Sequence, residues 1–585
     1  MVNRTNARTF AGRILAAAFT LMLLCVPAPA GAAALETVLQ DDAQLLHRPE
    51  DQLRRSLEEM RLLGVDRIRV TAGWSVLTRD ADKEARPAFD ATDPRAYEQE
   101  RWRNLDRLLV LAREYGFKTM VDIAFWAPAW ASTDAPGERG RTNVDVDQFR
   151  QFAVAVARRY SGSFILPRAV GVGGRGPLDP SNDERFLSEH FGTVNPEGSI
   201  SLHDVFGLNL LGIRDGDPVV AALGAGDSAP TAALPKVDHF TLWNEPNHTS
   251  FMRPQWVRQG KTWLPHSPHV YRAMVQQSYP AIKAVRPDST ILIGGTSFTG
   301  SYRRNGTGNV PPLRFLREMA CVDRELRPLK RSGCEKFSGV PGDGYSHHPY
   351  TMDSEPDARA KVGRPDDLPI ADLPRLAKLI DQLIARRRLA PAARNLWITE
   401  YGYETNPPVK GHIFSVGDQA KFLTWAEYLT ARVPTARSFA QFLLRDLPPA
   451  AFRVGSSRKR AFGQWQSGLL FEDGRPKLGA YSFRAGVFVQ ELPGRRLRIW
   501  GRLRVGAGAR AVSLEVRPAG SARWRGMLTS GPGERNPADR FAVDGRDAFT
   551  RFAPAPPRGK KWRYRLRYLD GTVWRTSPSV ASIER

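Results

Sequence analysis

Two short apolar segments of this chain each run into a glutamate, and this repeated pattern constrains the fold most. Residues 240–243 (FTLW) lead into Asn244 and Glu245, and residues 396–399 (LWIT) lead into Glu400. Short apolar runs bounded by turn residues are typical of buried strands. In a parallel barrel the carboxyl ends of all strands meet at one face, which carries the chemistry. The pattern therefore predicts a barrel with both glutamates in one site.

Two facing carboxyl groups have a defined chemical use. Cleavage of a glycosidic bond with retention needs one acid to protonate the leaving oxygen and one carboxylate to attack the anomeric carbon, about 5 to 5.5 Å apart. The alternative for each glutamate is an ordinary strand-end residue that caps a helix or pairs with an arginine. Because the pattern occurs twice, it favours a catalytic role for Glu245 and Glu400 over an ordinary strand-end role.

The segments around the two glutamates, WNEPN and ITEYG, resemble the paired signatures of the clan A glycoside hydrolases. The resemblance is to family 39, with its β-xylosidases and α-iduronidases, and to the cellulase-like family 5. It implies a (β/α)8 TIM barrel, with the acid/base Glu245 after strand four and the nucleophile Glu400 after strand seven. Asn244 would donate a hydrogen bond to the sugar 2-hydroxyl. The ordered segments cover most of the barrel, but only the two glutamate motifs are specific.

The same resemblance implies three supporting residues. Arg69, near the end of the strand at residues 66–70, would hold the nucleophile, although a plain salt bridge is the alternative. In GYSHHPY, side chains alternate, so His348 and Tyr350 share one face of a strand. Tyr350 would bond the nucleophile and His348 would border the site. Because His347 points away from its neighbour, we expect no metal ion here, and no cofactor is implied.

Three tryptophans are candidates for sugar binding. Trp126 and Trp130 lie in the aromatic loop into which the strand of KTMVDIAFWAPAWAS opens, and flat aromatic rings stack on the C–H faces of sugars. Their alternative is packing under that loop. Trp465 is placed like the tryptophan that lies under the sugar in many clan A enzymes.

The first 32 residues have the pattern of a signal peptide. Basic residues precede a short apolar run, and small residues follow it. The run is too short for a membrane span. We therefore expect a secreted protein without a membrane span; a retained N-terminal anchor is the alternative. In an oxidising compartment Cys321 and Cys334, which are close in sequence, would form a disulfide.

Beyond the signal peptide the sequence predicts two domains. The barrel would take residues 33–490, interrupted before strand four by an insertion at residues 161–236, rich in Gly, Pro and Asp. Loops of this length are uncommon in compact domains, so we expect it to be functional and to lie over the active-site face. Residues 491–585 show short alternating strands with Gly and Pro breaks, which predict an all-β Ig-like sandwich. We expect a spacer or a module docked on the barrel.

The net charge of +24 raises the question of an anionic partner. A basic field suits an acidic polysaccharide, an anionic cell wall or nucleic acid. The basic residues form no long block, which favours the alternative that they are spread over a soluble surface. No nucleic-acid-binding motif is present, so we expect no nucleic-acid partner. The predicted ligand is an oligosaccharide or polysaccharide, for which an acidic character stays open.

The sequence therefore predicts a secreted retaining glycoside hydrolase. Two alternatives remain open: a secreted glycan-binding protein without catalysis, and a transglycosylase that remodels cell-wall glycans. The intact pair of Glu245 and Glu400 argues against the first alternative. The sugar and its linkage depend on loops that the fold does not fix.

Overall fold

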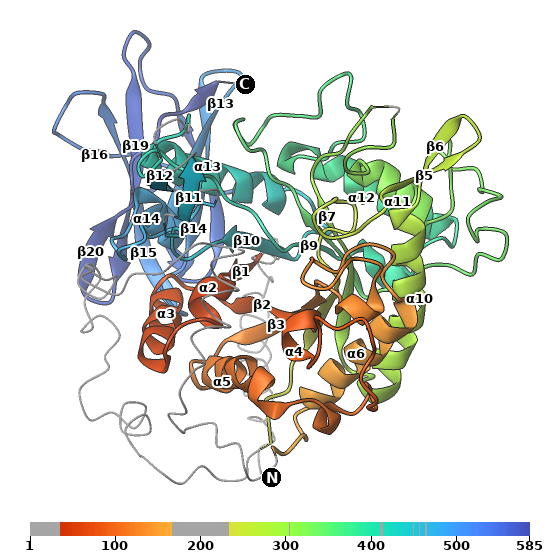
Figure 1. Ribbon diagram of the computed structural model, residues 1–585. Coiled ribbons are helices and arrows are strands. Elements are labelled where there is room, and N and C mark those ends of the chain that lie inside the picture. The colour runs from red at the N-terminus through yellow and green to blue at the C-terminus, as the bar shows by residue number, and fades with distance from the viewer. Residues whose placement is uncertain are drawn as a thin grey trace, which may run out of the picture. The chain divides into compact units, whose positions relative to one another are not determined.

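The computed structural model describes residues 35–166, 233–303, 305–409, 413–448, 450–454, 457–461 and 465–584. These residues belong to one compact unit (Figure 1). The predicted signal peptide lies outside them. None of the helices in these ranges combines the length and the apolar character that a membrane span needs.

A parallel sheet of eight strands forms the centre of the fold, in the order β10-β1-β2-β3-β4-β7-β8-β9. A parallel bridge between Leu396 and Ala436 joins its two edges. The predicted (β/α)8 barrel is thus confirmed, although its first strand had not been recognised in the sequence. The barrel strands are β1 (Glu36–Gln40), β2 (Arg67–Gly73), β3 (Lys118–Ala124), β4 (His239–Leu242), β7 (Thr290–Ser297), β8 (Gly344–His348), β9 (Leu396–Ile398) and β10 (Ser438–Phe442).

Amphipathic helices cover the barrel and bury their apolar stripes against it. A proline inside a helix is expected to kink the helix or to end it early. The early end is not observed at Pro280, because α10 continues to Val285. Ile282 is fully buried in the turn after the proline, and this burial offsets the lost hydrogen bond. The helices are α2 (Asp42–Leu45), α3 (Glu50–Leu62), α4 (Trp74–Leu77), α5 (Gln99–Glu114), α6 (Val146–Arg159), α10 (Ser267–Val285), α11 (Pro312–Met319), α12 (Leu373–Ala385), α13 (Val416–Ala431) and α14 (Leu478–Arg484).

The predicted insertion has a described stem at each end. Antiparallel bridges pair Ser161 with Lys236 and Ile165 with Ala233. The stem follows a helix and precedes β4, so it leaves the barrel at the amino-terminal ends of the strands. That is the face opposite the carboxyl ends, where the site lies. Whether the insertion lies over the site stays a prediction. Residues 167–232 lie outside the described ranges.

Two antiparallel sheets follow the barrel, as predicted for the all-β region. One has the order β18-β14-β13-β21, and the other has the order β16-β15-β19-β20, with β17 also paired to β15. A core that includes Val487, Ile499, Leu514 and Leu566 lies between them. The strands are β13 (Ala485–Leu492), β14 (Arg496–Leu503), β15 (Ala509–Pro518), β16 (Arg525–Gly526), β17 (Phe541–Asp544), β18 (Ala548–Pro554), β19 (Trp562–Asp570), β20 (Val573–Thr576) and β21 (Ile583–Glu584).

The transition from barrel to sheets differs from the sequence expectation. The sequence predicts a last helix of the barrel through Tyr481 and Phe488, but α14 ends at Arg484 and Phe488 lies on β13. Its ring stacks on Tyr428 of α13, with ring centres 4.5 Å apart. Both faces of β13 are therefore buried, which hides the alternation typical of a strand. The division of domains at residue 491 stays a prediction.

Two further hairpins decorate the barrel. They pair β5 (Trp256–Gln259) with β6 (Thr262–Pro265), and β11 (Ala450–Val454) with β12 (Ser457–Ala461). Both follow barrel strands, so they extend the loops at the carboxyl-terminal face.

Candidate active site

The turn after β4 presents Glu245 at the carboxyl end of the barrel. Trp243 and Glu245 both have positive φ angles, 61° and 38°. Such angles cost non-glycine residues about 1 to 3 kcal/mol and persist only where the surroundings fix them. The Trp243 amide donates to the carbonyl of Ile123 (2.8 Å), and the Glu245 amide donates to that of Gly295 (2.9 Å). The neighbouring strands thus hold the acid in place.

The carbonyl that receives the Glu245 amide lies on a bulge in β7. Gly294 has a φ of 100°, and the register with β8 shifts between Gly294 and Thr296. A Cβ atom on Gly294 would lie 2.7 Å from the carbonyl oxygen of Ser346. Glycine is therefore required here, since the bulge brings two strands closer than a side chain allows.

Glu400 follows β9 and is held by two donors, one on β2 and one just after β8. Its Oε1 accepts a hydrogen bond from Nη1 of Arg69 (2.6 Å), and its Oε2 accepts one from the Tyr350 hydroxyl (3.2 Å). Both contacts are those implied by the resemblance. A cation and a hydroxyl donor stabilise the ionised form of a carboxyl group.

Arg69 is 1% exposed and connects side chains from several strands. Its Nη2 lies 2.9 Å from Oδ2 of Asp122 and 3.2 Å from Oδ1 of Asn244. Its Nη1 also donates to Gln40. Because the oxygen of Asn244 accepts from Arg69, the amide nitrogen of Asn244 is left to donate to a ligand.

His348 joins the two glutamates. Its Nδ1 lies 3.0 Å from Oε1 of Glu245 and 3.5 Å from Oε2 of Glu400. Burial lowers the pKa of His348 well below its usual value, so the ring is neutral and shares a hydrogen bond with Glu245 through Nδ1. His347 faces the other way, and its Nε2 lies 2.8 Å from the carbonyl of Leu368. The two faces predicted for this strand are thus observed.

The two carboxyl groups are close together but have unequal surroundings. Oxygens of Glu245 and Glu400 lie within 4.8 Å of each other. Burial and the charge of Glu400 raise the pKa of Glu245 well above its usual value. Burial raises the pKa of Glu400 to about 7, while Arg69 and Tyr350 oppose the rise. A proton on Glu245 and a charge on Glu400 is therefore the favoured state of the pair.

The structure places the predicted tryptophan Trp465 beside the site residue Tyr350. Its ring centre lies 5.7 Å from that of Tyr350, and both side chains line one small cavity with Glu404 and Ser467. Trp465 therefore lies one side chain away from Glu400. Its contact with a sugar stays a prediction.

Trp126 and Trp130 are held by packing contacts. Trp126 is 7% exposed, and its Nε1 donates to the carbonyl of Ser250. Trp130 lies edge-on to Trp74, with ring centres 6.0 Å apart. These contacts favour packing under the loop over sugar binding, because most of the Trp126 surface is already covered.

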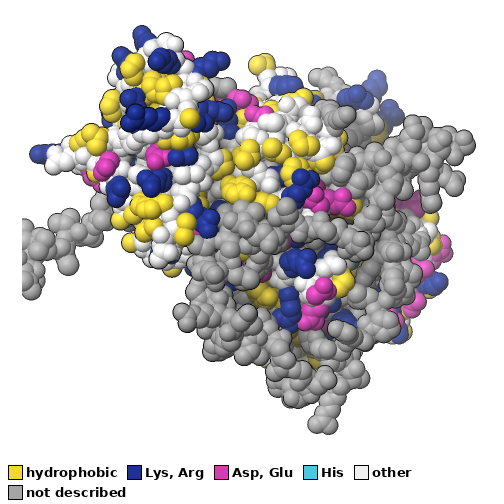
Figure 2. Space-filling model, turned by 90° about the vertical axis from the view of Figure 1, so that its left-hand side faces the viewer, with side chains coloured by type: hydrophobic (Ala, Val, Ile, Leu, Met, Phe, Trp, Pro, Cys, Tyr) yellow, Lys and Arg dark blue, Asp and Glu magenta, His cyan; other side chains and the backbone are white. Residues whose placement is uncertain are grey.

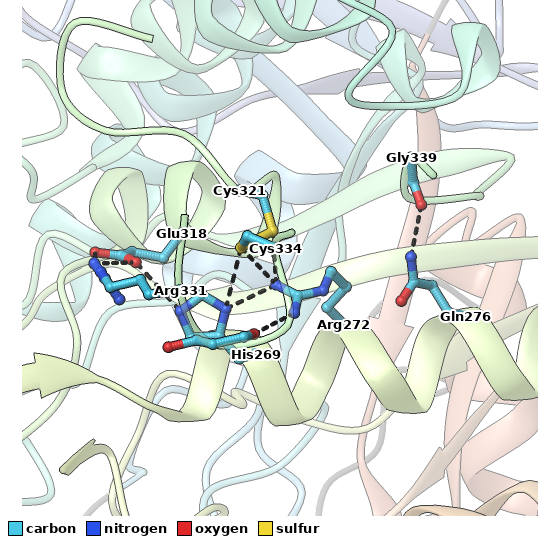
Figure 3. The surroundings of a disulfide bond; sticks show 9 residues. His269, Arg272, Gln276, Glu318, Cys321, Arg331, Cys334 and Gly339 are labelled. Atoms are coloured by element: carbon cyan, nitrogen blue, oxygen red, sulfur yellow. Dashed lines mark hydrogen bonds and ion pairs between the residues drawn. A yellow bond between two sulfur atoms is a disulfide. The ribbon is translucent and has the colours of Figure 1, made fainter. Parts of the chain in front are cut away.

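The predicted disulfide between Cys321 and Cys334 is present (Figure 3). Arg272 of α10 lies beside it, with Nη1 3.1 Å from Sγ of Cys321 and 2.7 Å from Nδ1 of His269. His269 in turn lies 3.3 Å from Glu318 of α11. The disulfide is thus tied to the two helices and has a structural role.

Two groups of the described side chains have the spacing of metal ligands. One combines His269 with the two cysteines, whose sulfurs are bonded to each other and so unavailable. The other combines Glu245, His348 and Glu400. Both oxygens of Glu400 already accept hydrogen bonds, and Arg69 would repel a cation. The second group therefore suits proton transfer better than metal binding.

Asp122 and Gln40 belong to the site but were not identified from the sequence. Asp122 is fully buried, and its Oδ1 accepts a hydrogen bond from the Thr241 hydroxyl. The signal was present, because Asp122 is the single charged residue in the apolar run at residues 119–124 and charges are almost never buried unpaired. Gln40 closes the strand that had been overlooked.

No family model matches this chain, and no curated protein matches it. Among solved structures, one described as a glycoside hydrolase is 8% identical, with a TM-score of 0.38, and the match covers 89% of this chain and 92% of the other. A family 5 mannosidase from Rhizomucor miehei is 14% identical, with a TM-score of 0.32, covering 76% and 88%. The catalytic domain of a β-amylase from Paenibacillus polymyxa is 11% identical, with a TM-score of 0.33, covering 77% and 98%.

Family 5 enzymes, expected from the sequence, are thus among the similar solved structures, while the likeness to family 39 stays a prediction. Identities and TM-scores this low assign neither an activity nor a substrate to this chain. Its function has to follow from the geometry of its own residues.

Proposed function

We propose that the protein is a retaining glycoside hydrolase that cleaves O-glycosidic bonds in oligosaccharides or polysaccharides. The observation that carries the proposal is the unequal pair of Glu245 and Glu400, with oxygens within 4.8 Å and only Glu400 bonded to Arg69. Retaining enzymes hold their carboxyl groups about 5 to 5.5 Å apart, whereas inverting enzymes separate them by about 6.5 to 9.5 Å to admit water. The distance supports retention.

In the first step, the Glu400 carboxylate attacks the anomeric carbon while Glu245 gives its proton to the departing oxygen. The glycosidic C–O bond breaks, and an ester forms between the sugar and Glu400. Tyr350 and Arg69 keep Glu400 ionised and oriented before the attack. His348, by donating to one oxygen of Glu245, leaves the other oxygen to carry the proton.

In the second step, Glu245 acts as a base. Esterification removes the charge of Glu400, which is one cause of the raised pKa of Glu245. The pKa of Glu245 therefore falls in the intermediate, and its carboxylate can take a proton from water. The resulting hydroxide equivalent attacks the anomeric carbon, breaks the ester and restores Glu400.

The direct test is covalent trapping. Activated 2-deoxy-2-fluoro glycosides, tried as a panel of sugars, should inactivate the protein and add one fluorosugar to Glu400, seen by peptide mass spectrometry. The Glu355→Gln variant, altered at a partly exposed glutamate outside the site, should be labelled like the wild type. A label on another residue, or an inverted product in proton NMR, would refute the assignment.

The two alternative functions predict different results in these experiments. A glycan-binding protein without catalysis would neither be labelled nor release an aryl leaving group. A transglycosylase would be labelled, but added acceptor sugars would then appear in the product. Hydrolysis leaves the acceptors unmodified, so product analysis with and without acceptors separates the two enzymes.

We also propose that the protein is secreted. The disulfide between Cys321 and Cys334 supports this, since such bonds persist in oxidising compartments. Fractionation of the producing cells, with the N-terminal residue of the mature chain determined by sequencing, tests the proposal. Full-length protein that stays inside the cell would contradict it.

A further inference from the structure

Positive charge is concentrated in the C-terminal sheets. Residues 491–585 contain 21 lysines and arginines against 8 aspartates and glutamates, whereas the whole chain contains 85 and 61. The excess of 13 basic residues in this segment is more than half of the excess of 24 for the chain. Figure 2 shows Lys and Arg side chains among hydrophobic ones over these sheets.

Strand alternation places several of these arginines on one face. The inward residues of β19, Tyr564 to Asp570 in alternation, are buried, so Arg563, Arg565 and Arg567 point outward. Side chains two residues apart on a strand are about 7 Å apart, so the three form a regular row. Arg517 of β15 pairs with Arg563 across the sheet and widens the row.

Two tryptophans hold these arginines in place. Trp524 lies 4.5 Å from the guanidinium carbon of Arg517 and 4.2 Å from that of Arg565. Trp574 lies 4.7 Å from that of Arg567. A guanidinium stacked on an aromatic ring keeps its N–H groups free at its edge. The arginine face, as we name it, consists of Arg517, Arg563, Arg565, Arg567, Trp524 and Trp574.

The acid on this face, Glu515, pairs closely with Arg565 and only at the limit of ion-pair distance with Arg567. Glu515 accepts hydrogen bonds from Arg565, at 2.6 Å from its Nη2, but lies 4.0 Å from Arg567. Arg517 is partly exposed, and its buried Nε has no hydrogen-bond partner within the described residues. Arg563 is exposed. Among the described residues, Arg517, Arg563 and Arg567 thus have no carboxylate at hydrogen-bond distance, and Arg517 and Arg567 are also held by a tryptophan ring.

We propose that the arginine face binds a linear polysaccharide that carries a carboxylate on its repeating sugars. The edges of Arg517, Arg563 and Arg567 match carboxylates in bidentate geometry. Their regular row fits a polymer with repeating charges better than a single small anion. The choice of a polysaccharide over another polyanion rests on the proposed function, because a second site for the substrate polymer raises its local concentration at the barrel. The C-terminal region is then a binding module, whereas the sequence predicted a spacer or a module docked on the barrel.

Affinity electrophoresis of the full chain carrying Glu400→Gln tests the proposal without cleavage of the ligand. Polygalacturonate should retard the protein, and its methyl-esterified form, which has the same backbone without the charges, should not. The Arg563→Ala/Arg567→Ala variant should bind at least about tenfold more weakly, since each charge-assisted bond is strong. Trp574→Ala should also weaken binding, because it releases Arg567 from its stacked position.

The matched control is Arg535→Ala/Arg558→Ala, which removes two exposed charges of the same domain outside this face. The proposal would be overturned if this control lost as much binding to polygalacturonate, or if the esterified polymer also retarded the protein. Tighter binding of single-stranded DNA at equal salt would overturn it too. Hydrolysis of aryl glycosides by the otherwise wild-type chain is measured separately. Its absence would refute the proposed function and leave the binding result standing.

Discussion

Arg69 donates a 2.6 Å hydrogen bond to Glu400, although 331 positions separate the two residues in the sequence. The contact exists because β2 and β9 belong to one barrel and their carboxyl ends open on the same face. Asp122 lies on the other side of the guanidinium, 2.9 Å from Nη2. The charge of the nucleophile is therefore balanced inside a buried network, and changes in that network should alter catalysis.

The Tyr350→Phe variant should change the pH dependence of activity. The Tyr350 hydroxyl stabilises the ionised form of Glu400, so its removal raises the pKa of Glu400 above its value of about 7. The carboxylate then forms only at higher pH, and the acidic limb of kcat/KM should move upward by up to about one pH unit. The Tyr403→Phe variant removes a neighbouring buried hydroxyl that does not contact Glu400. If both profiles coincide with the wild type, Tyr350 does not tune the nucleophile.

The Glu245→Gln variant should show a strong dependence on the leaving group. Loss of the acid should slow cleavage of a phenyl glycoside by about 10² to 10⁴-fold. A dinitrophenol leaving group needs little protonation, so its release in the first step should be nearly normal. Pre-steady-state release of the two phenols measures the difference, and Glu400→Gln should abolish both. Equal slowing of the two substrates would contradict the role of Glu245 as the acid.

The Arg504→Ala variant should destabilise the whole described unit. Arg504 comes from the C-terminal sheets and donates to Glu427 of α13 (2.6 Å) and to Thr37 of β1 (2.8 Å). Its removal leaves the buried carboxylate of Glu427 with a weaker partner. The free energy of unfolding should fall by about 3 kcal/mol or more. Urea unfolding measures the change, with Arg510→Ala, which donates to the carbonyls of Val505 and Ala507 nearby in the chain, as the control. Separate unfolding of barrel and sheets would show that this contact does not couple them.

The Cys321→Ser/Cys334→Ser variant should lose stability while keeping activity. The disulfide closes a short loop, with a sequence separation of 13. A constraint on a loop of this length is worth about 3 kcal/mol of unfolding free energy. The turnover of aryl glycosides at 25 °C should persist, because neither cysteine contacts the two glutamates. A reductant should lower the unfolding free energy of the wild type to that of the variant. If the reductant also lowered the unfolding free energy of the variant, it would act on a target other than this disulfide.

The sequence allowed prediction of much of the barrel because its elements are locally encoded. The stripe of α12 and the apolar runs of β4, β7 and β9 can be recognised within a short window. β13 was mistaken for part of a helix because it is buried on both faces, against α13 and against the second sheet. The position of the insertion stem follows from a topological rule, since a connection from helix to strand lies at the amino-terminal face.

The sequence by itself determined which residues could perform the chemistry. A glutamate directly after a buried strand is a local pattern, and its repetition identified Glu245 and Glu400. Only the tertiary structure decided which of the two is charged, because that depends on Arg69, Asp122 and Tyr350 arriving from other strands. Burial, distance and charge balance act through space, and residues far apart along the chain contribute to them equally.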